Sequence, residues 1–392
     1  MPTRRAVEQH IAVFGESGSG KTVLASSFFG ATQEPEFLRE SLFDVIADDT
    51  GQGSRLHRNY LGMKDSARLP DATRFDSTSY AFTIRPKDPP NARRAKNRPF
   101  DAVRLVWHDY PGEWFEQGVS GPVEQRRRVD TFRALLGSDV ALFLVDGQRL
   151  LDNVGEEERY LKSLFGNFRN GLLSLRDDLL DAGKPLVRFP RIWVMALSKA
   201  DLLPDLDAYA FRDLLIGKAG EDIDELRKVI EGFVEARDAL SVGEDFVLLS
   251  SARFEPDRIQ VRDRVGVDLV LPLAATLPLE RHVRWAGAKR IPGKVAEQLL
   301  DSGAGALGVS ATAVALLGKV PLPGPLRVAQ GILGAVFAGP ALEQAADLAG
   351  AKLREANATA RAKHDYLAAM LTGFRLDLER GEQQRVLLRS RR

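Results

Sequence analysis

The chain has no cysteine and only five histidines among its 392 residues. The lack of cysteine excludes disulfides and thiolate metal sites and is consistent with a reducing compartment. Five histidines leave little material for a metal cluster. A surplus of either charge is also missing, because 55 basic residues nearly cancel 54 acidic ones. The overall charge therefore points neither to nucleic acid nor to an acidic substrate, and we expect no nucleic-acid partner.

Long apolar runs are scarce as well. Residues 1–14 mix charged and polar side chains with a short apolar stretch, which is unlike a secretory signal. The longest region of low polarity, 303–342, is divided by a proline-rich break into runs of 16 and 15 residues, 303–318 and 328–342. Each run is shorter than the ~20 residues that a membrane-spanning helix needs. We therefore expect a buried helical hairpin in a cytoplasmic protein. The alternative is a hairpin that inserts shallowly, so that the protein is peripheral at the inner face of the membrane.

What the chain does have is an alternation of apolar strands and amphipathic helices. Six runs predict strands, at 10–14, 80–85, 102–108, 140–145, 192–197 and 246–249, and helices are predicted between them at 21–29, 123–136, 156–180 and 223–240. This order predicts an α/β fold with a doubly wound, mainly parallel sheet and helices on both faces. We expect 80–85 to be an edge strand paired with 102–108, because Pro89 and Pro90 in the turn cannot continue a ladder.

The composition and the predicted secondary structure change towards the C-terminus. After about Pro256, strands become scarce and alanine and glycine increase, so we place a domain boundary near Trp285. Residues 1–285 would form the main domain and residues 286–392 an α-helical module. The module would contain the hairpin 303–342, an amphipathic helix over 352–380 and a frayed basic tail, in which the basic residues are Arg385, Arg389, Arg391 and Arg392.

One motif carries a strong chemical signal. Gly15-Glu16-Ser17-Gly18-Ser19-Gly20-Lys21-Thr22 matches the P-loop pattern G-x-x-x-x-G-K-[ST] and lies between a predicted strand and a predicted helix. Its glycines let backbone N–H groups turn inward around phosphates, and the helix N-terminus adds a favourable dipole. Lys21 would reach the β- and γ-phosphates and Thr22 would bind Mg²⁺. We assign these eight residues and Val23 to a nucleotide site.

Three further motifs follow later strands. Asp109-Tyr110-Pro111-Gly112 resembles the D-x-x-G of GTPases, which places a carboxylate near magnesium and a glycine N–H at the terminal phosphate. Ser198-Lys199-Ala200-Asp201 resembles the guanine motif [NT]-K-x-D, in which Asp201 would accept from the guanine ring and Lys199 would pack on the base. Ser198 replaces Asn or Thr and keeps a hydroxyl that could tie this turn to the P-loop.

Ser250-Ser251-Ala252 resembles the S-A loop whose backbone N–H contacts the guanine oxygen, and we assign Ser251 and Ala252 to the site.

All four motifs occur in the order of a TRAFAC-type, Ras-like P-loop GTPase, each at the carboxyl end of a predicted strand, where open α/β sheets bind ligands. The chain resembles that superclass over about 7–285. Within it, His108-Asp109-Tyr110-Pro111-Gly112-Glu113-Trp114 is similar to the bacterial phage-shock-associated stress GTPases, and the bacterial double-GTPase proteins of anti-invader systems are a second candidate. The resemblance implies GTP and GDP as ligands, Mg²⁺ as cofactor, hydrolysis of GTP, and a switch that an unidentified protein effector reads.

The resemblance also suggests a catalytic set of Lys21, Gly112 and Glu113. Glu113 stands where Ras-like proteins have a glutamine that orients the attacking water, and a carboxylate there either positions that water or is a solvated switch acid. For the threonine that completes the magnesium ligands Thr22 and Asp109, we choose Thr73, with Thr78 as the runner-up.

Two alternatives to a GTPase remain open. The first is a P-loop ATPase in which 198–201 merely ends a strand. The second is a nucleotide-binding scaffold with little turnover that acts at a membrane or in an assembly.

Overall fold

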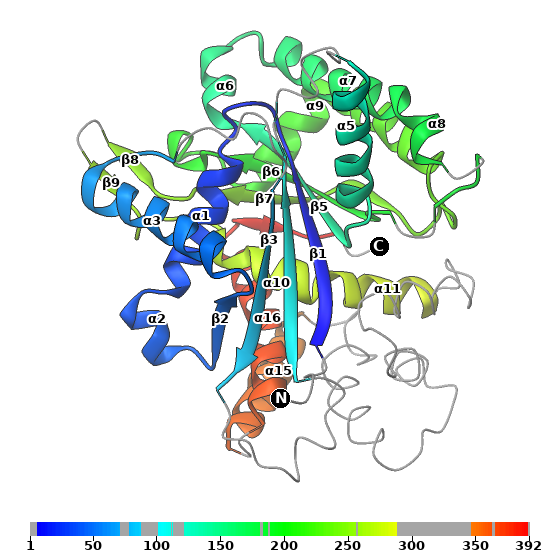
Figure 1. Cartoon of the computed structure of the whole chain (residues 1–392). Coiled ribbons are helices and arrows are strands. Elements are labelled where there is room, and N and C mark those ends of the chain that lie inside the picture. Colours follow the sequence, from blue (N-terminus) through cyan, green and yellow to red (C-terminus); the bar gives the residue numbers. More distant parts are fainter. Residues whose placement is uncertain are drawn as a thin grey trace.

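One mixed sheet runs through the structure. The computed structural model describes residues 6–70, 78–87, 101–110, 112, 121–180, 183–186, 189–255, 258–287, 346–362 and 365–390. Eight strands lie in the order β10-β7-β6-β5-β1-β4-β3-β2, with helices on both faces (Figure 1). In chain order they are β1 (Ala6–Phe14), β2 (Phe43–Ala47), β3 (Thr78–Pro86), β4 (Ala102–Asp109), β5 (Val140–Asp146), β6 (Ile192–Ser198), β7 (Ser241–Leu249) and β10 (Leu387–Leu388). A separate small hairpin pairs β8 (Arg253–Glu255) with β9 (Arg258–Gln260).

The middle of the sheet is parallel and its outer parts are antiparallel. Strands β4, β1, β5, β6 and β7 pair in parallel, whereas the pairs β2 with β3, β3 with β4 and β7 with β10 are antiparallel. Every residue of β5 and β6 is buried, as expected of parallel strands that helices cover on both sides. Side chains of β1 alternate between two cores, because Ile11 and Val13 pack on one face and Phe14 on the other.

The helices form one layer on each face of the sheet. The first face is covered by α1 (Lys21–Thr32), α3 (Thr50–Ser66), α10 (Val270–Ala275), α11 (Leu277–Gly287) and α16 (Tyr366–Gln383). The short α2 (Pro35–Glu40) lies beside α1, and α15 (Ala346–Ala362) packs on α16. The second face is covered by α5 (Pro122–Leu135), α6 (Gly147–Asp152), α7 (Glu157–Ser174), α8 (Arg176–Leu179) and α9 (Ala208–Glu231). The predicted fold class, a doubly wound and mainly parallel sheet with helices on both faces, is confirmed.

One prediction about the edges of the sheet is wrong, and each edge has a strand that was not predicted. The strand predicted at 80–85 does pair with the strand predicted at 102–108, but it is not an edge strand, because β2 pairs with its other side. At the opposite edge, β10 pairs with β7. Both missed strands are short, and β10 has only two residues, so neither has enough alternation to be recognised in the sequence.

The C-terminal helices also differ from the prediction. The single helix expected over 352–380 is two helices, α15 and α16, and the carboxylate of Asp365 caps the second one by accepting the N–H of Ala368 at 3.3 Å. The basic tail is not frayed as far as Ser390. The side chain of Arg389 is only 15% exposed and forms ion pairs with Glu280 and Glu382, at 3.3 and 2.8 Å. One carboxylate distant in sequence, that of Glu280, and one close in sequence, that of Glu382, hold this segment in place.

The C-terminal segment therefore shares the core of the sheet. Met370, Phe374 and Leu378 of α16 belong to the same hydrophobic cluster as the first-face residues of the central strands. The domain boundary near residue 285 stays a prediction. Among the described helices, none is both long and apolar enough to cross a membrane. Thr73, Glu113 and the hairpin 303–342 lie outside the described residues.

Candidate functional site

The P-loop connects β1 to α1 at the carboxyl edge of the sheet. Gly18 and Gly20 have φ values of 79° and 87°, in the left-handed region that side chains disfavour, which explains why the loop needs glycine there. The amine of Lys21 is buried and donates to the carbonyl oxygens of Gly15 and Glu16, at 2.7 and 3.0 Å. The lysine is thus held against the loop by the loop's own backbone.

Tyr110 fastens the segment after β4 to this loop. Its hydroxyl accepts the N–H of Gly15 at 2.9 Å, and the amine of Lys21 lies 5.2 Å from the centre of its ring. The ring packs against Phe14 and Phe132, which fixes its position between the sheet and α5. Tyr110 was not among the predicted site residues. Its place directly after Asp109, at the end of a buried strand, is the signal that could have found it.

Thr22 and Asp109 form a pair that fits a magnesium ion. The hydroxyl of Thr22 donates to Oδ2 of Asp109 at 3.0 Å. Asp109 is only 2% exposed, and its Oδ1 has no hydrogen-bond partner in the described part of the chain. Burial raises the pKa of Asp109, while the charge of Lys21 and the bond from Thr22 oppose that rise. A hydroxyl beside a carboxylate oxygen without a donor is the hard oxygen set that Mg²⁺ prefers. The structure brings these two predicted ligands together, and Thr73 lies outside the described residues.

Gly112 lies directly against the P-loop. A Cβ atom added to it would come within 2.3 Å of the backbone nitrogen of Ser17 and 2.4 Å of the carbonyl carbon of Glu16. Because backbone atoms cannot move aside cheaply, only glycine fits. The end of the Asp109-to-Gly112 motif therefore meets the loop that would hold the phosphates.

The predicted guanine motif is ordered by contacts with neighbouring strands. Asp201 accepts the hydroxyl of Ser250 at 2.6 Å and the N–H of Phe254 at 3.4 Å. Lys199 adopts a left-handed φ of 54°, and its amine pairs with Asp146 at the end of β5, at 2.8 Å. The hydroxyl of Ser198 donates to the carbonyl of Val145 at 3.3 Å. It thus ties the turn to β5, and not to the P-loop as the sequence led us to expect.

The S-A loop is joined to the P-loop helix. The hydroxyl of Ser27, on α1, donates to the carbonyl of Ser251 at 2.7 Å. The side chain of Val23 packs against the hydrophobic cluster that contains Ala252. The serine hydroxyl that orients Asp201 belongs to Ser250 and not to Ser251. Ser250 belongs to the same motif, but the sequence alone predicts only Ser251 and Ala252 as site residues.

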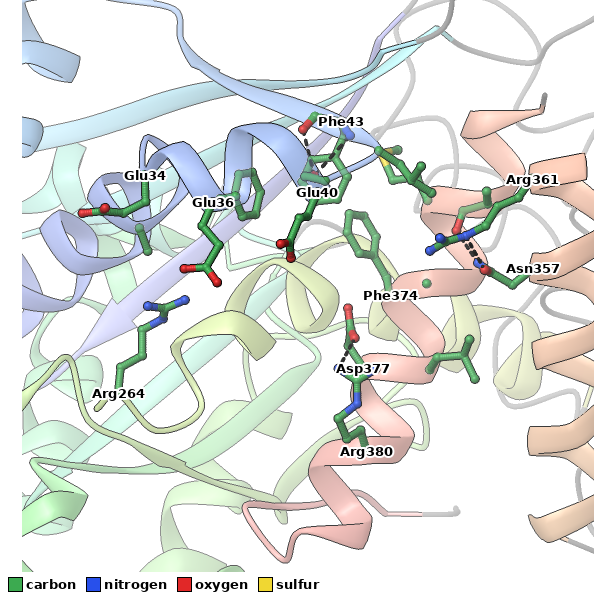
Figure 2. A pocket seen from close by; sticks show the side chains of 18 of the residues that line it. Glu34, Glu36, Glu40, Phe43, Arg264, Asn357, Arg361, Phe374, Asp377 and Arg380 are labelled. Atoms are coloured by element: carbon green, nitrogen blue, oxygen red, sulfur yellow. Dashed lines mark hydrogen bonds and ion pairs between the residues drawn. The ribbon is translucent and has the colours of Figure 1, made fainter. Parts of the chain in front are cut away.

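The described structure also has a cavity of about 590 Å³, but it lies elsewhere. It opens between α2, the start of β2 and the C-terminal helices α15 and α16, and none of the motif residues lines it. Figure 2 shows Glu36 facing Arg264 across this cavity, with Phe374 pointing into it beside Phe43. The rings of Phe43 and Phe374 are 5.4 Å apart, which joins β2 to α16. The nucleotide motifs therefore lie apart from this cavity, at the carboxyl edge of the sheet.

Comparisons with known proteins give distant likenesses only. No protein-family model and no curated protein matches the chain. It is similar to nucleolar GTP-binding protein 1 from Plasmodium falciparum at 14% identity and a TM-score of 0.33, over 77% of this chain and 99% of that chain. It is also similar to Era in complex with MgGDPNP and nucleotides of 16S ribosomal RNA, at 14% identity and a TM-score of 0.24, over 72% of this chain and 67% of that chain. These values carry no argument about function, so the assignment of a P-loop NTPase fold depends on the strand order and loop geometry described above.

Proposed function

We propose that this chain is a GTPase that binds guanine nucleotides with Mg²⁺ and hydrolyses GTP to GDP and phosphate as a nucleotide-dependent switch. The observation that carries the proposal is the hydrogen bond from Ser250 to Asp201, at the same sheet edge as the P-loop. This bond fixes a carboxylate acceptor where the S-A loop meets the P-loop helix through Ser27 and Ser251. Guanine presents two neighbouring N–H donors to such an acceptor, and adenine has no matching pair.

The phosphate end of the site has the groups that phosphoryl transfer requires. Lys21 and the backbone N–H groups of the loop neutralise charge on the β- and γ-phosphates. Thr22 and Asp109 would hold Mg²⁺, which would supply further charge neutralisation during phosphoryl transfer. The N–H of Gly112 faces the terminal phosphate, a role that its contact with the P-loop supports. From the sequence, Glu113 orients the attacking water and Thr73 completes the magnesium ligands.

The switch would act through the segment after β4. Tyr110 and Gly112 both contact the P-loop. A γ-phosphate bound at this loop would therefore change the contacts made by the start of that segment. We propose that a protein effector or the C-terminal helices read the resulting change. The sequence of the Asp109-to-Trp114 stretch supports a bacterial stress or defence GTPase. The alternative output of the switch is contact between residues 303–342 and a membrane.

The first experiment measures the affinity of fluorescent GDP in the presence of Mg²⁺, competed by unlabelled GTP, GDP, ATP and ADP. We expect guanine nucleotides alone to compete, and we expect Asp201→Asn to lose that preference. Asp205→Asn is the matched control, since Asp205 is exposed and forms no part of the site. Equal competition by ATP would show instead an ATPase whose residues 198–201 merely end a strand.

Turnover needs a second measurement, because nucleotide binding alone is also what a scaffold would show. We expect phosphate release from GTP in the wild type and its loss in Lys21→Ala, whereas contaminating activity would survive that substitution. If the protein binds guanine nucleotides specifically but Lys21→Ala does not reduce phosphate release, the nucleotide-binding scaffold is favoured.

A further inference from the structure

An arginine on the second face of the sheet reaches the P-loop. Arg149 lies on α6, the short helix that follows β5, and its Nη1 is 3.0 Å from Oε2 of Glu16. Its Nη2 donates to the carbonyl of Ser17 at 3.5 Å. Glu16 and Ser17 are the second and third residues of the phosphate-binding loop. Arg149 belongs to none of the four sequence motifs, so the sequence alone did not identify it.

The helix that carries Arg149 is fixed between the two halves of the site. Asp146 begins this helix by accepting the N–H of Gln148 at 2.9 Å, and its other oxygen pairs with Lys199 of the guanine motif at 2.8 Å. A Cβ at Gly147 would come within 2.7 Å of the carbonyl oxygen of Ser198, so the helix start is packed against that turn. The position of Arg149 is therefore set by the same elements that set the base and phosphate ends of the site.

The partner of Arg149 is an unfavourable residue for a phosphate-binding loop. The carboxylate of Glu16 is only 10% exposed, so its negative charge is poorly screened by water. A loop that wraps phosphates relies on N–H groups and positive charge, and a bare carboxylate within it repels the ligand. The guanidinium of Arg149, at 38% side-chain exposure, supplies a compensating charge from the side of α6.

We propose that Arg149 is a positioning residue that neutralises Glu16 and thereby allows this P-loop to accept a nucleoside triphosphate. The inference depends on the proposed nucleotide binding and adds a determinant outside the motifs. It predicts that removing Arg149 weakens nucleotide binding only while Glu16 keeps its charge. It also predicts a larger effect on GTP than on GDP, because the γ-phosphate adds negative charge at the loop.

A double-mutant cycle on the full chain tests this inference. Dissociation constants for GTP and GDP are measured with Mg²⁺ for the wild type, Arg149→Ala, Glu16→Gln and the double variant. We expect Arg149→Ala to weaken GTP binding about 10-fold when Glu16 is present, and about 2-fold or less in the Glu16→Gln background. Arg149→Lys should recover part of the loss, since it restores the charge without the fork of donors.

Arg159→Ala is the matched control, because Arg159 on α7 forms an exposed ion pair with Glu156, the residue before that helix, at 2.6 Å. An equal loss from Arg149→Ala in both Glu16 backgrounds would overturn the inference, as that result would assign Arg149 to the phosphates or to the fold. No loss in either background would also overturn it. A wild type that binds neither GTP nor GDP would contradict the proposed function itself, which distinguishes the two failures.

Discussion

The hydroxyl of Ser250 lies 2.6 Å from Oδ1 of Asp201, so the last residue of the guanine motif is held by a side chain from the end of the next strand. Asp201 leaves β6 and Ser250 leaves β7, which are parallel neighbours. The carboxyl ends of such strands meet at one edge of a sheet, where ligands of this fold class bind. The pair therefore brings two sequence motifs together at the edge of the sheet where we propose that the base binds.

This pair predicts the effect of Ser250→Ala. Without the hydroxyl, Asp201 loses an oriented hydrogen bond to its charged group, a contribution of about 1–2 kcal/mol, and GDP affinity should fall about 5- to 30-fold. Fluorescent GDP binding measures the change. Ser174→Ala is the control, since the hydroxyl of Ser174 donates to the carbonyl of Gly171 within an exposed turn of α7. GDP affinity that stays within 2-fold of the wild type would contradict a role for Ser250.

The pair of Thr22 and Asp109 predicts how binding depends on magnesium. Wild-type affinity for GDP should be higher with Mg²⁺ than with a chelator, and Thr22→Ala and Asp109→Asn should each remove most of that difference. Thr32→Ala is the matched control, because Thr32 lies at the end of the same helix and its hydroxyl bonds only near that end among the described residues, to Phe29 and Gln33. A magnesium dependence that both site variants retain would exclude these residues as ligands.

The parts of the fold that the sequence predicted are those with a strong local signal. The buried strands β5 and β6 are continuous apolar runs, and the P-loop has glycines at the positions where φ is positive. Motif spacing also placed Asp109 at the end of β4 and Asp201 in the turn that follows β6, where the structure has them. Local pattern is enough for these features, since each is encoded by adjacent residues.

The features that the sequence did not predict depend on long-range contacts. The two residues of β10 form a strand only because β7 offers an edge. Arg149 reaches Glu16 across 133 positions of sequence, and neither residue has a neighbour that reveals the other. Arg389, just after β10, is ordered by Glu280 on α11. Tertiary packing decides such features, so they cannot be predicted from any short stretch of the sequence.

A buried ion pair predicts a large loss of stability. Arg281 on α11 and Asp245 on β7 are 1% and 0% exposed, with Nη2 2.5 Å from Oδ1. Asp245 also accepts from Ser241 and from the backbone of Ser390. Arg281→Ala would leave a buried carboxylate without its cation, which costs about 3–5 kcal/mol in the free energy of unfolding.

Urea denaturation measures this loss, and Lys162→Ala is the control. Lys162 pairs with Glu158 on the surface of α7, and both side chains are about half exposed, so its removal should change stability by less than about 0.5 kcal/mol. A loss below about 1 kcal/mol for Arg281→Ala would show that the contact between α11 and β7 contributes little to the fold.

His282, also on α11, predicts how stability depends on pH. Burial, together with a smaller effect of the nearby charge of Arg191, lowers its pKa from 6.5 to about 3. In the unfolded chain the imidazole takes up a proton near pH 6.5, but in the folded chain it stays neutral. The unfolded state therefore binds more protons between about pH 6.5 and pH 3, and this contribution to stability is lost as the pH falls through that window.

The measurement compares the urea stability of the wild type and His282→Asn at pH 7.5 and pH 5.0. At pH 5.0 the difference between the two pKa values accounts for about 2 kcal/mol of stability lost by the wild type. His282→Asn has no group that titrates in this window at that position, so it should lose about 2 kcal/mol less over the same change of pH, even if it is less stable at pH 7.5. Comparing the two pH values within each protein distinguishes the titration of His282 from a packing defect. A packing defect lowers the free energy of unfolding equally at pH 7.5 and at pH 5.0. Parallel losses in the two proteins would mean that His282 reaches water, or finds an acceptor for its proton, in the folded state.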